Sequence, residues 1–237
     1  MPSSLSRIVG LIGSGLSLIW TVVQLSSFDP EATQHLDLGL RFVRFSLDSL
    51  GFTMVLLTNA VIFLIYLANF QRSIVNETRF TALTFLMQFG LIGIFTSSTI
   101  LGFYIFWELT LLPVFLILYW FGTFEKQKAL LQFFLYTLLG SLAMLLSVIG
   151  LMHVTNQQTY EALLAADLSQ LGNTGILLMG RFLLAFAVKI PLFPFHTWQA
   201  ETYTKAPTAG TMLLSALMLK MALFGLIKWV LPIFAGT

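Results

Sequence analysis

Three charged residues lie deep inside long apolar stretches, and they are the residues of this sequence most suited to chemistry. Glu108, Lys189 and Lys220 each stand among aliphatic and aromatic neighbours. A charged side chain costs roughly 2.5–3.5 kcal/mol at the centre of a membrane-spanning helix. We therefore expect the three to face one another or internal water. Glu108 and Lys189 have opposite charges and form the natural pair, and Lys220 would lie further along the same polar axis.

These residue types suit proton transfer. Burial disfavours the charged form of a lysine, whereas a nearby carboxylate favours it. Moving or neutralising Glu108 would therefore switch Lys189 between holding and releasing a proton. His196 follows Lys189 by seven residues, on the same face of an uninterrupted helix, and histidine exchanges protons near neutral pH. Two alternatives stay open, a static ion pair that fixes helix packing and an interfacial histidine bonded to a loop.

Two prolines directly after Lys189 predict a broken helix. Pro191 and Pro194 have no N–H group with which to bond the carbonyls of Ala187 and Ile190. Carbonyls freed at bilayer depth must be satisfied by side chains or water. We therefore expect hydratable backbone beside Lys189.

The composition identifies the class of protein. Hydrophobic residues make up 57% of the chain and charged residues 9%, whereas a soluble domain carries about 25% charge. The chain is therefore expected to be an integral membrane protein. It has no cysteine, which excludes disulfides and thiolate-bound metals or iron–sulfur clusters on this chain. The net charge of +2 is too small and too scattered to indicate a nucleic-acid partner.

The apolar stretches predict an all-α fold, because strands of a membrane barrel would alternate polar and apolar residues. A spanning helix needs about 20 apolar residues. We predict seven, over residues 5–25, 49–70, 80–96, 100–121, 129–153, 174–195 and 209–231. Lys228 is expected to extend to the membrane interface, and Asp48 to cap the second helix or to hold a lysine.

Two segments carry a specific family resemblance. FWELTLLPVFLILYWFG (106–122) and KIPLFPFHTWQAETYTKAPTAGTMLLSALMLKMALFGLIKW (189–229) resemble the NuoM-type antiporter-like subunit of respiratory complex I. FSLDSLGFTMVLLT (45–58) resembles the segment around that family's D-G-[IL]-S motif. The resemblance implies a proton-translocating subunit of NADH:quinone oxidoreductase in a bacterial cytoplasmic membrane or a mitochondrial inner membrane. Mrp-type cation/proton antiporters and a purely structural subunit are the competing hypotheses.

The resemblance also implies roles for the candidate residues. Glu108 matches the family's glutamate, Lys189 the lysine paired with it on a broken helix, and Lys220 the next lysine of the relay. His196 matches a histidine of the hydrated axis. The subunit would carry no cofactor, since quinone, FMN and iron–sulfur clusters belong to other subunits. Its partners would be the other membrane subunits, neighbouring antiporter-like subunits among them, and lipids.

The chain departs from the family in two ways. Where the family reads H-T-W-L-P-D-A-H-x-E-A-P, this sequence has Ala200, Glu201, Tyr203 and Lys205 in place of proline, aspartate, histidine and glutamate. The second departure is in the number of spans. The family has about fourteen spans with two inverted five-helix repeats, whereas seven spans are predicted here. We expect residues 1–48 to form a first helix and a polar connection, 49–79 a second helix and loop, and 80–237 one repeat. Another chain or segment would then carry the second repeat.

Overall fold

The computed structural model describes residues 3–36, 42–71, 76–166, 168 and 171–235. The helices are α1 (Ser3–Leu25), α2 (Ser49–Ala68), α3 (Glu77–Thr96), α4 (Ile100–Phe121), α5 (Gln127–Thr155), α6 (Tyr160–Leu164), α7 (Asn173–Lys189) and α8 (Thr197–Lys205). The last span joins α9 (Thr208–Leu213), α10 (Leu219–Gly225) and α11 (Leu231–Ile233) through two π-helical turns, η2 (Leu214–Met218) and η3 (Leu226–Val230). Two short strands, β1 (Gln34–Leu36) and β2 (Phe45–Leu47), pair antiparallel.

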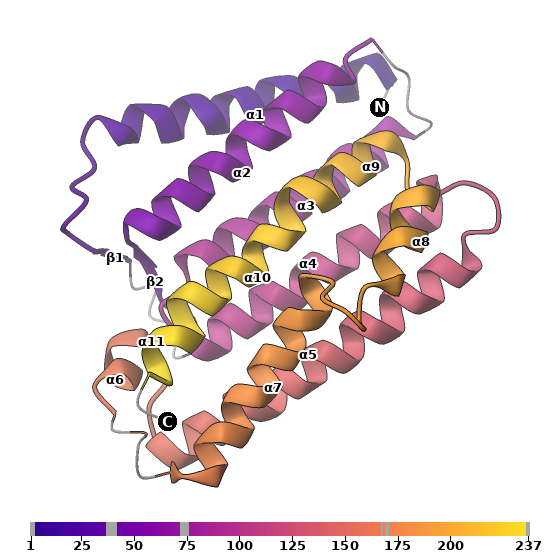
Figure 1. Ribbon diagram of the computed structural model, residues 1–237. Coiled ribbons are helices and arrows are strands. Elements are labelled where there is room, and N and C mark those ends of the chain that lie inside the picture. The colour runs from indigo at the N-terminus through magenta and orange to yellow at the C-terminus, as the bar shows by residue number, and fades with distance from the viewer. Residues whose placement is uncertain (1–2, 37–41, 72–75, 167, 169–170, 236–237) are drawn as a thin grey trace.

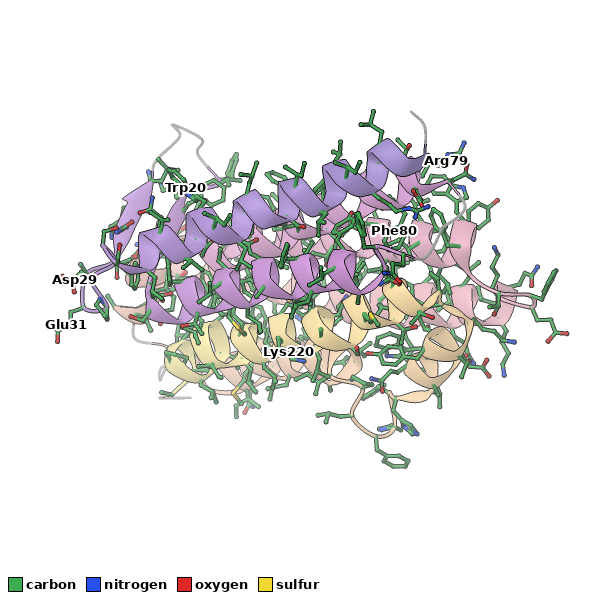
Figure 2. The ribbon with its side chains drawn as sticks, turned by 90° about the horizontal axis from the view of Figure 1, so that it is seen from above. Trp20, Asp29, Glu31, Arg79, Phe80 and Lys220 are labelled. Atoms are coloured by element: carbon green, nitrogen blue, oxygen red, sulfur yellow. The ribbon has the colours of Figure 1, made fainter. Side chains whose placement is uncertain are left out.

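The long helices run side by side, as Figure 1 shows. α1 and α2 lie on one side, α3, α4 and α10 in the middle, and α5 and α7 on the other side. One end of this bundle carries α8 and the other carries α6, and these names are kept for the two ends below. Figure 2 places Arg79 at the α8 end, and Asp29 and Glu31 at the α6 end.

The number of uninterrupted spans differs from the sequence prediction. Among the described residues, six helices are long and apolar enough to cross a membrane, and seven were predicted. The difference lies in the predicted helix 174–195. Its helical part, α7, has 17 residues and ends at Lys189, and the chain becomes helical again only at α8. The all-helical membrane fold agrees with the prediction.

The loops at the α6 end form a layer tied by backbone hydrogen bonds. The Ser98 N–H donates to the carbonyl of Arg44 (2.9 Å), and the Tyr160 N–H donates to the carbonyl of Ser98 (2.8 Å). Asp48 caps α2, because its Oδ1 accepts from the Gly51 N–H at 2.8 Å. Backbone groups in loops at a membrane surface thus find partners within the chain.

A chain of buried amide and hydroxyl groups joins the first three helices. Asn59 Nδ2 of α2 donates to Thr21 Oγ1 of α1 at 2.7 Å, and Gln88 Nε2 of α3 donates to Asn59 Oδ1 at 2.7 Å. All three side chains are buried. Polar groups inside a membrane protein hold helices together because hydrocarbon offers them no other partner.

Replacing Asn59 by alanine should therefore destabilise the packing of α1 on α2. Each hydrogen bond between membrane helices contributes about 0.6 kcal/mol, up to about 1.7, so we expect a loss of roughly 1–3 kcal/mol. The measurement is the thermal unfolding of the detergent-extracted protein in its native assembly. Thr53→Val is the control, since the hydrogen bond that the Thr53 hydroxyl makes within the described residues goes to the carbonyl of Ser49 on its own helix, at an exposed position. Equal destabilisation by both variants would contradict the prediction.

Candidate functional site

The structure brings Glu108 and Lys189 near one another in the middle of the helix bundle. Lys189 is the last residue of α7, is 3% exposed, and holds its Nζ 5.5 Å from the centre of the Trp107 ring. Glu108 follows Trp107 on α4 and interacts electrostatically with Lys189. The side chains of Tyr104 and Ser141 also interact with the Glu108 carboxylate. Two of the four candidate residues therefore share one buried site.

The expected direct ion pair is not formed. Among the described residues, neither Lys189 Nζ nor the buried Oε1 of Glu108 has a hydrogen-bond partner. Within the described part of the chain, the ammonium interacts with the ring face of Trp107 and with the field of the nearby carboxylate. A buried polar atom without a partner costs free energy. A small movement of either side chain, or a water molecule between them, would therefore give Lys189 and Glu108 new hydrogen bonds.

The end of α7 follows from its prolines. The last helical bond runs from the Ile190 N–H to the carbonyl of Phe186 (2.7 Å). The carbonyl of Ala187, which Pro191 cannot bond, accepts from the Leu192 N–H at 2.9 Å. Hence this freed carbonyl is satisfied by the chain's own backbone.

Trp198 fixes the start of α8 against the end of α7. Its side chain is 2% exposed, and Nε1 donates to the carbonyl of Val188 at 2.9 Å. Its ring lies 5.6 Å from that of Phe133 on α5. Val188 itself packs against Gly140 of α5, where an added Cβ would meet the valine side chain at 3.2 Å. The residue next to Lys189 is thus held between α5 and α8.

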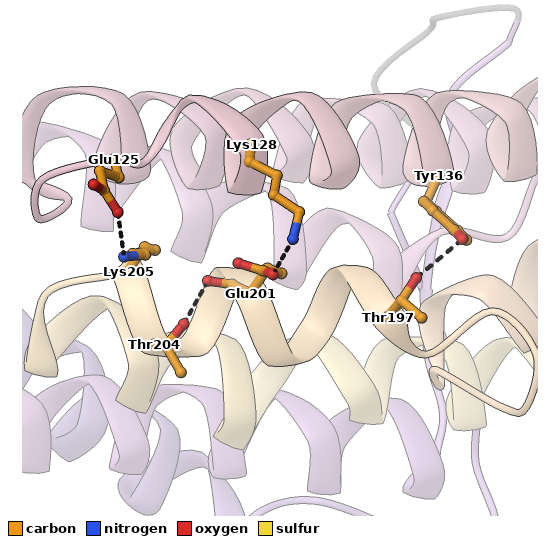
Figure 3. Close-up of polar contacts among 7 residues, drawn as sticks. All are labelled: Glu125, Lys128, Tyr136, Thr197, Glu201, Thr204 and Lys205. Atoms are coloured by element: carbon orange, nitrogen blue, oxygen red, sulfur yellow. Dashed lines mark hydrogen bonds and ion pairs between the residues drawn. The ribbon is translucent and has the colours of Figure 1, made fainter.

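Polar contacts hold the outer face of α8 on α5, as Figure 3 shows. Lys128 Nζ lies 2.6 Å from Glu201 Oε1, and the hydrogen bond from this lysine keeps the pKa of the Glu201 carboxyl below its ordinary value. Thr197 Oγ1 donates to the Tyr136 hydroxyl at 3.0 Å. Since these contacts are exposed, they orient α8 more than they stabilise it.

His196 does not join Glu108 and Lys189. It is exposed at the start of α8, and its ring lies 5.7 Å from the ring of Phe193, which is 87% exposed. The expectation of a shared face assumed an uninterrupted helix. The turn over residues 190–196 removes that geometry.

Lys220 also lies away from the buried pair. It is partly exposed on α10, and its Nζ donates to the carbonyl of Ser215 in η2 at 3.1 Å. Figure 2 places it about midway along the bundle, on the outside of the last span. The α7–α8 connection lies on that same side of the bundle in Figures 1 and 2. Lys220 and His196 are therefore on a surface of this chain.

Two buried or half-buried charges were missed or misplaced by the sequence analysis. Lys228 was expected to extend to the membrane interface; its side chain is 3% exposed, and its Nζ lies 2.9 Å from Asp48 Oδ2 at the α6 end. Both alternatives for Asp48 hold at once, since its other oxygen caps α2. Arg181 lies half-buried in the middle of α7. Arg181 could have been found by the criterion that selected Lys189, a charged residue inside an apolar stretch.

The described residues contain no group of three or more His, Cys, Asp or Glu side chains able to hold a metal ion. The chemistry that the buried site can perform itself is the gain and loss of a proton at Lys189 and Glu108.

Comparison with known proteins identifies the family. Residues 97–237 match the family described as NADH:quinone oxidoreductase/Mrp antiporter, transmembrane. The chain belongs to this family. NADH-ubiquinone oxidoreductase chain 4 of Arabidopsis thaliana is 30% identical over 97% of this chain and 48% of its own length. F(420)H(2) dehydrogenase subunit M of Methanosarcina mazei is 32% identical over 96% of this chain and 49% of its own length.

Solved structures of NADH:quinone oxidoreductase/Mrp family members share the fold. Respiratory complex I from Thermus thermophilus contains a chain that matches with a TM-score of 0.85 and 30% identity, over 97% of this chain and 49% of that chain. A chain of the Mrp complex from Dietzia sp. has a TM-score of 0.83 at 20% identity, over 99% of this chain and 45% of that chain, which shows a common fold.

These comparisons confirm the resemblance to the NuoM-type, chain 4-like subunit and the integral membrane location expected for a bacterial or mitochondrial inner membrane. The chain spans about half the length of the curated relatives it matches.

Proposed function

We propose that this chain is a proton-translocating membrane subunit of NADH:quinone oxidoreductase, complex I. The observation that carries the proposal is the state of Lys189. Its ammonium is buried, makes no hydrogen bond within the described residues, and lies in the field of Glu108 without touching it. A lysine kept only for packing would gain most from a direct ion pair, whereas a lysine that exchanges protons needs a charged and a neutral form of similar free energy.

The proposed step is a proton exchange controlled by the distance between two side chains. When Glu108 is ionised and close, it stabilises the ammonium of Lys189. When Glu108 moves away or takes up a proton, burial favours loss of the proton from Lys189. Tyr104 and Ser141 interact with the same carboxylate and provide it with a second position. Movement of Glu108 therefore sets the direction of proton flow.

Protons would reach Lys189 along the contact between α5 and α8. Gln132 lies one helical turn after Lys128 and one turn before Tyr136, so it shares the α5 face that contacts α8. Among the residues that the structure describes, its buried Oε1 has no hydrogen-bond partner, and neither has the buried hydroxyl of Thr202 on α8. Buried polar atoms in such a position are ordinarily satisfied by water. Water held there would carry protons toward Lys189.

Lys220 and His196 would continue the relay at the surface of this chain. A lysine midway along a membrane span is costly when it faces lipid, so this surface would be covered by another polypeptide. The proposal assigns that place to a chain or segment carrying the second repeat. The other partners would be the remaining membrane subunits of the complex, including neighbouring antiporter-like subunits, and lipids.

The proposal leaves redox chemistry to other subunits. Quinone, FMN and iron–sulfur clusters would be bound elsewhere in the complex, and electron transfer to quinone would drive the charge movement through this chain. The relatives support this division, since a subunit of an F(420)H(2) dehydrogenase and a chain 4 of an NADH-ubiquinone oxidoreductase match this chain about equally. A subunit type that occurs in complexes with different electron donors is not expected to bind the electron donor itself.

The competing proposal is a cation/proton antiporter subunit of the Mrp kind, with which this chain shares its fold. The decisive measurement is the composition of the native assembly, by mass spectrometry after mild detergent extraction. A large assembly with quinone-reducing subunits and a polypeptide bearing the second repeat is the expected result. Recovery of the chain with Mrp-type partners alone would overturn the complex I proposal.

A further inference from the structure

Lys228 and Asp48 form a buried ion pair that the proposed proton path does not use. Lys228 belongs to η3 at the α6 end of the last span, and its Nζ lies 2.9 Å from Asp48 Oδ2. The rings of Tyr160 and Phe224 each lie 5.5 Å from the same ammonium. The lysine side chain is 3% exposed. A carboxylate and two ring faces around one ammonium hold the end of the Lys228 side chain in a fixed position.

Asp48 connects the last span to the rest of the chain. One of its oxygens caps α2 at Gly51, and the other binds Lys228. Asp48 directly follows β2, whose residue Phe45 pairs with Ser97, and Ser98 in turn bonds Tyr160 through the backbone. The carboxylate therefore fastens the last span to the layer of hydrogen-bonded loops that closes the α6 end.

The last span is irregular on both sides of Lys220. η2 precedes this lysine and η3 follows it, and Lys228 lies inside η3. A π-helical turn holds an extra residue, is rare, and often marks a functional position. One residue of an α-helix corresponds to about 100° of rotation, so loss of the η3 turn would rotate Lys220 by an angle on the order of 100° relative to α11, which follows the turn.

We propose that the Asp48–Lys228 ion pair positions Lys220 by holding the η3 turn against the loops of the α6 end. The ion pair fixes the rotation of the last span about its own axis at Lys228. This rotation sets the direction in which the Lys220 side chain points. Lys228 is thus a positioning residue for proton transfer, acting through Lys220. This inference rests on the proposed function, in which Lys220 belongs to the relay.

The test replaces each member of the pair in the assembled native complex. Lys228→Met removes the ammonium, and Asp48→Asn removes the ion pair but keeps an oxygen that can cap α2. We expect both to lower the number of protons translocated per quinone reduced by about two-fold or more, and to speed amide hydrogen exchange over residues 219–225. Lys228→Arg keeps the charge and should restore both values. Lys205→Met is the matched control, because the Lys205–Glu125 contact is 4.0 Å long and Glu125 is 90% exposed.

Three results would overturn the inference. The first is a normal proton stoichiometry in assembled Lys228→Met and Asp48→Asn complexes. The second is a lower amount of complex with normal stoichiometry in each, since this would show a purely structural pair. The third is unchanged hydrogen exchange over residues 219–225 in both variants. This result would contradict the inference even if pumping were reduced. Lys189→Met in parallel separates the two proposals, because normal pumping there would remove the proposed function itself.

Discussion

Replacing Lys189 by methionine should abolish proton translocation through this subunit while leaving the complex assembled. Methionine keeps most of the length and the apolar stem of lysine and removes the group that carries the proton. Positioned proton transfer contributes about 100-fold to 10,000-fold in rate, so we expect a fall of at least about 100-fold in the proton flux through this site. The measurement is acidification of proteoliposomes that contain the purified complex, driven by quinone reduction.

The same variant distinguishes a proton carrier from a packing lysine. The ammonium of Lys189 is buried and makes no hydrogen bond within the described residues, so its removal should cost little stability and is expected to leave assembly intact. Lys126→Met is the control, since Lys126 lies at the α8 end and, within the described residues, its ammonium contacts the end of α4 through the Gly122 carbonyl and the Tyr119 ring. Normal pumping by an assembled Lys189→Met complex would refute a role in proton transfer.

The spanning helices were the part of the fold that sequence reasoning predicted well. Five predicted segments begin and end within a few residues of α1 to α5, because about 20 apolar residues crossing a membrane have no alternative to a helix. The predicted span over 209–231 was also found, but its two π-helical turns were not expected. The contact of η3 with Asp48 joins residues far apart in the sequence, which local sequence patterns do not reveal.

The candidate site was predicted in part, for a related reason. Charges in apolar stretches selected Glu108 and Lys189 correctly as neighbours, since a buried charge needs a partner. The absence of a direct contact was not foreseen, nor was the Trp107 ring, whose centre lies 5.5 Å from the Lys189 ammonium. His196 was misplaced because the spacing rule holds only within one helix, and α7 ends before it. The contact of Lys228 with Asp48 was missed, although the predicted topology puts both residues at the same membrane surface and could have found the pair.

Replacing Trp198 by alanine should be the most destabilising single change at the connection between α7 and α8. The indole is 2% exposed between α5 and α7, and it carries the hydrogen bond to the carbonyl of Val188. Removing a buried tryptophan side chain costs about 3–5 kcal/mol, and leaving a buried carbonyl unpaired costs about 1–3 kcal/mol. The exposed contacts of Lys128 and Thr197 that remain would not hold α8 in place, because exposed polar pairs contribute little. Thermal unfolding of the detergent-extracted complex measures the effect.

Two further variants separate packing from the hydrogen bond. Trp198→Phe keeps most of the ring volume against Phe133 and loses only the Nε1 donor, so its cost should be close to the 1–3 kcal/mol of the unpaired carbonyl. Trp120→Ala is the control, because Trp120 is 43% exposed and its ring contacts the Arg79 guanidinium at 5.3 Å. A Trp198→Ala complex as stable as Trp120→Ala would show that α8 is held by other contacts. If instead Trp198→Ala unfolds early while Trp198→Phe retains pumping, the indole volume is what keeps α8 over the end of α7.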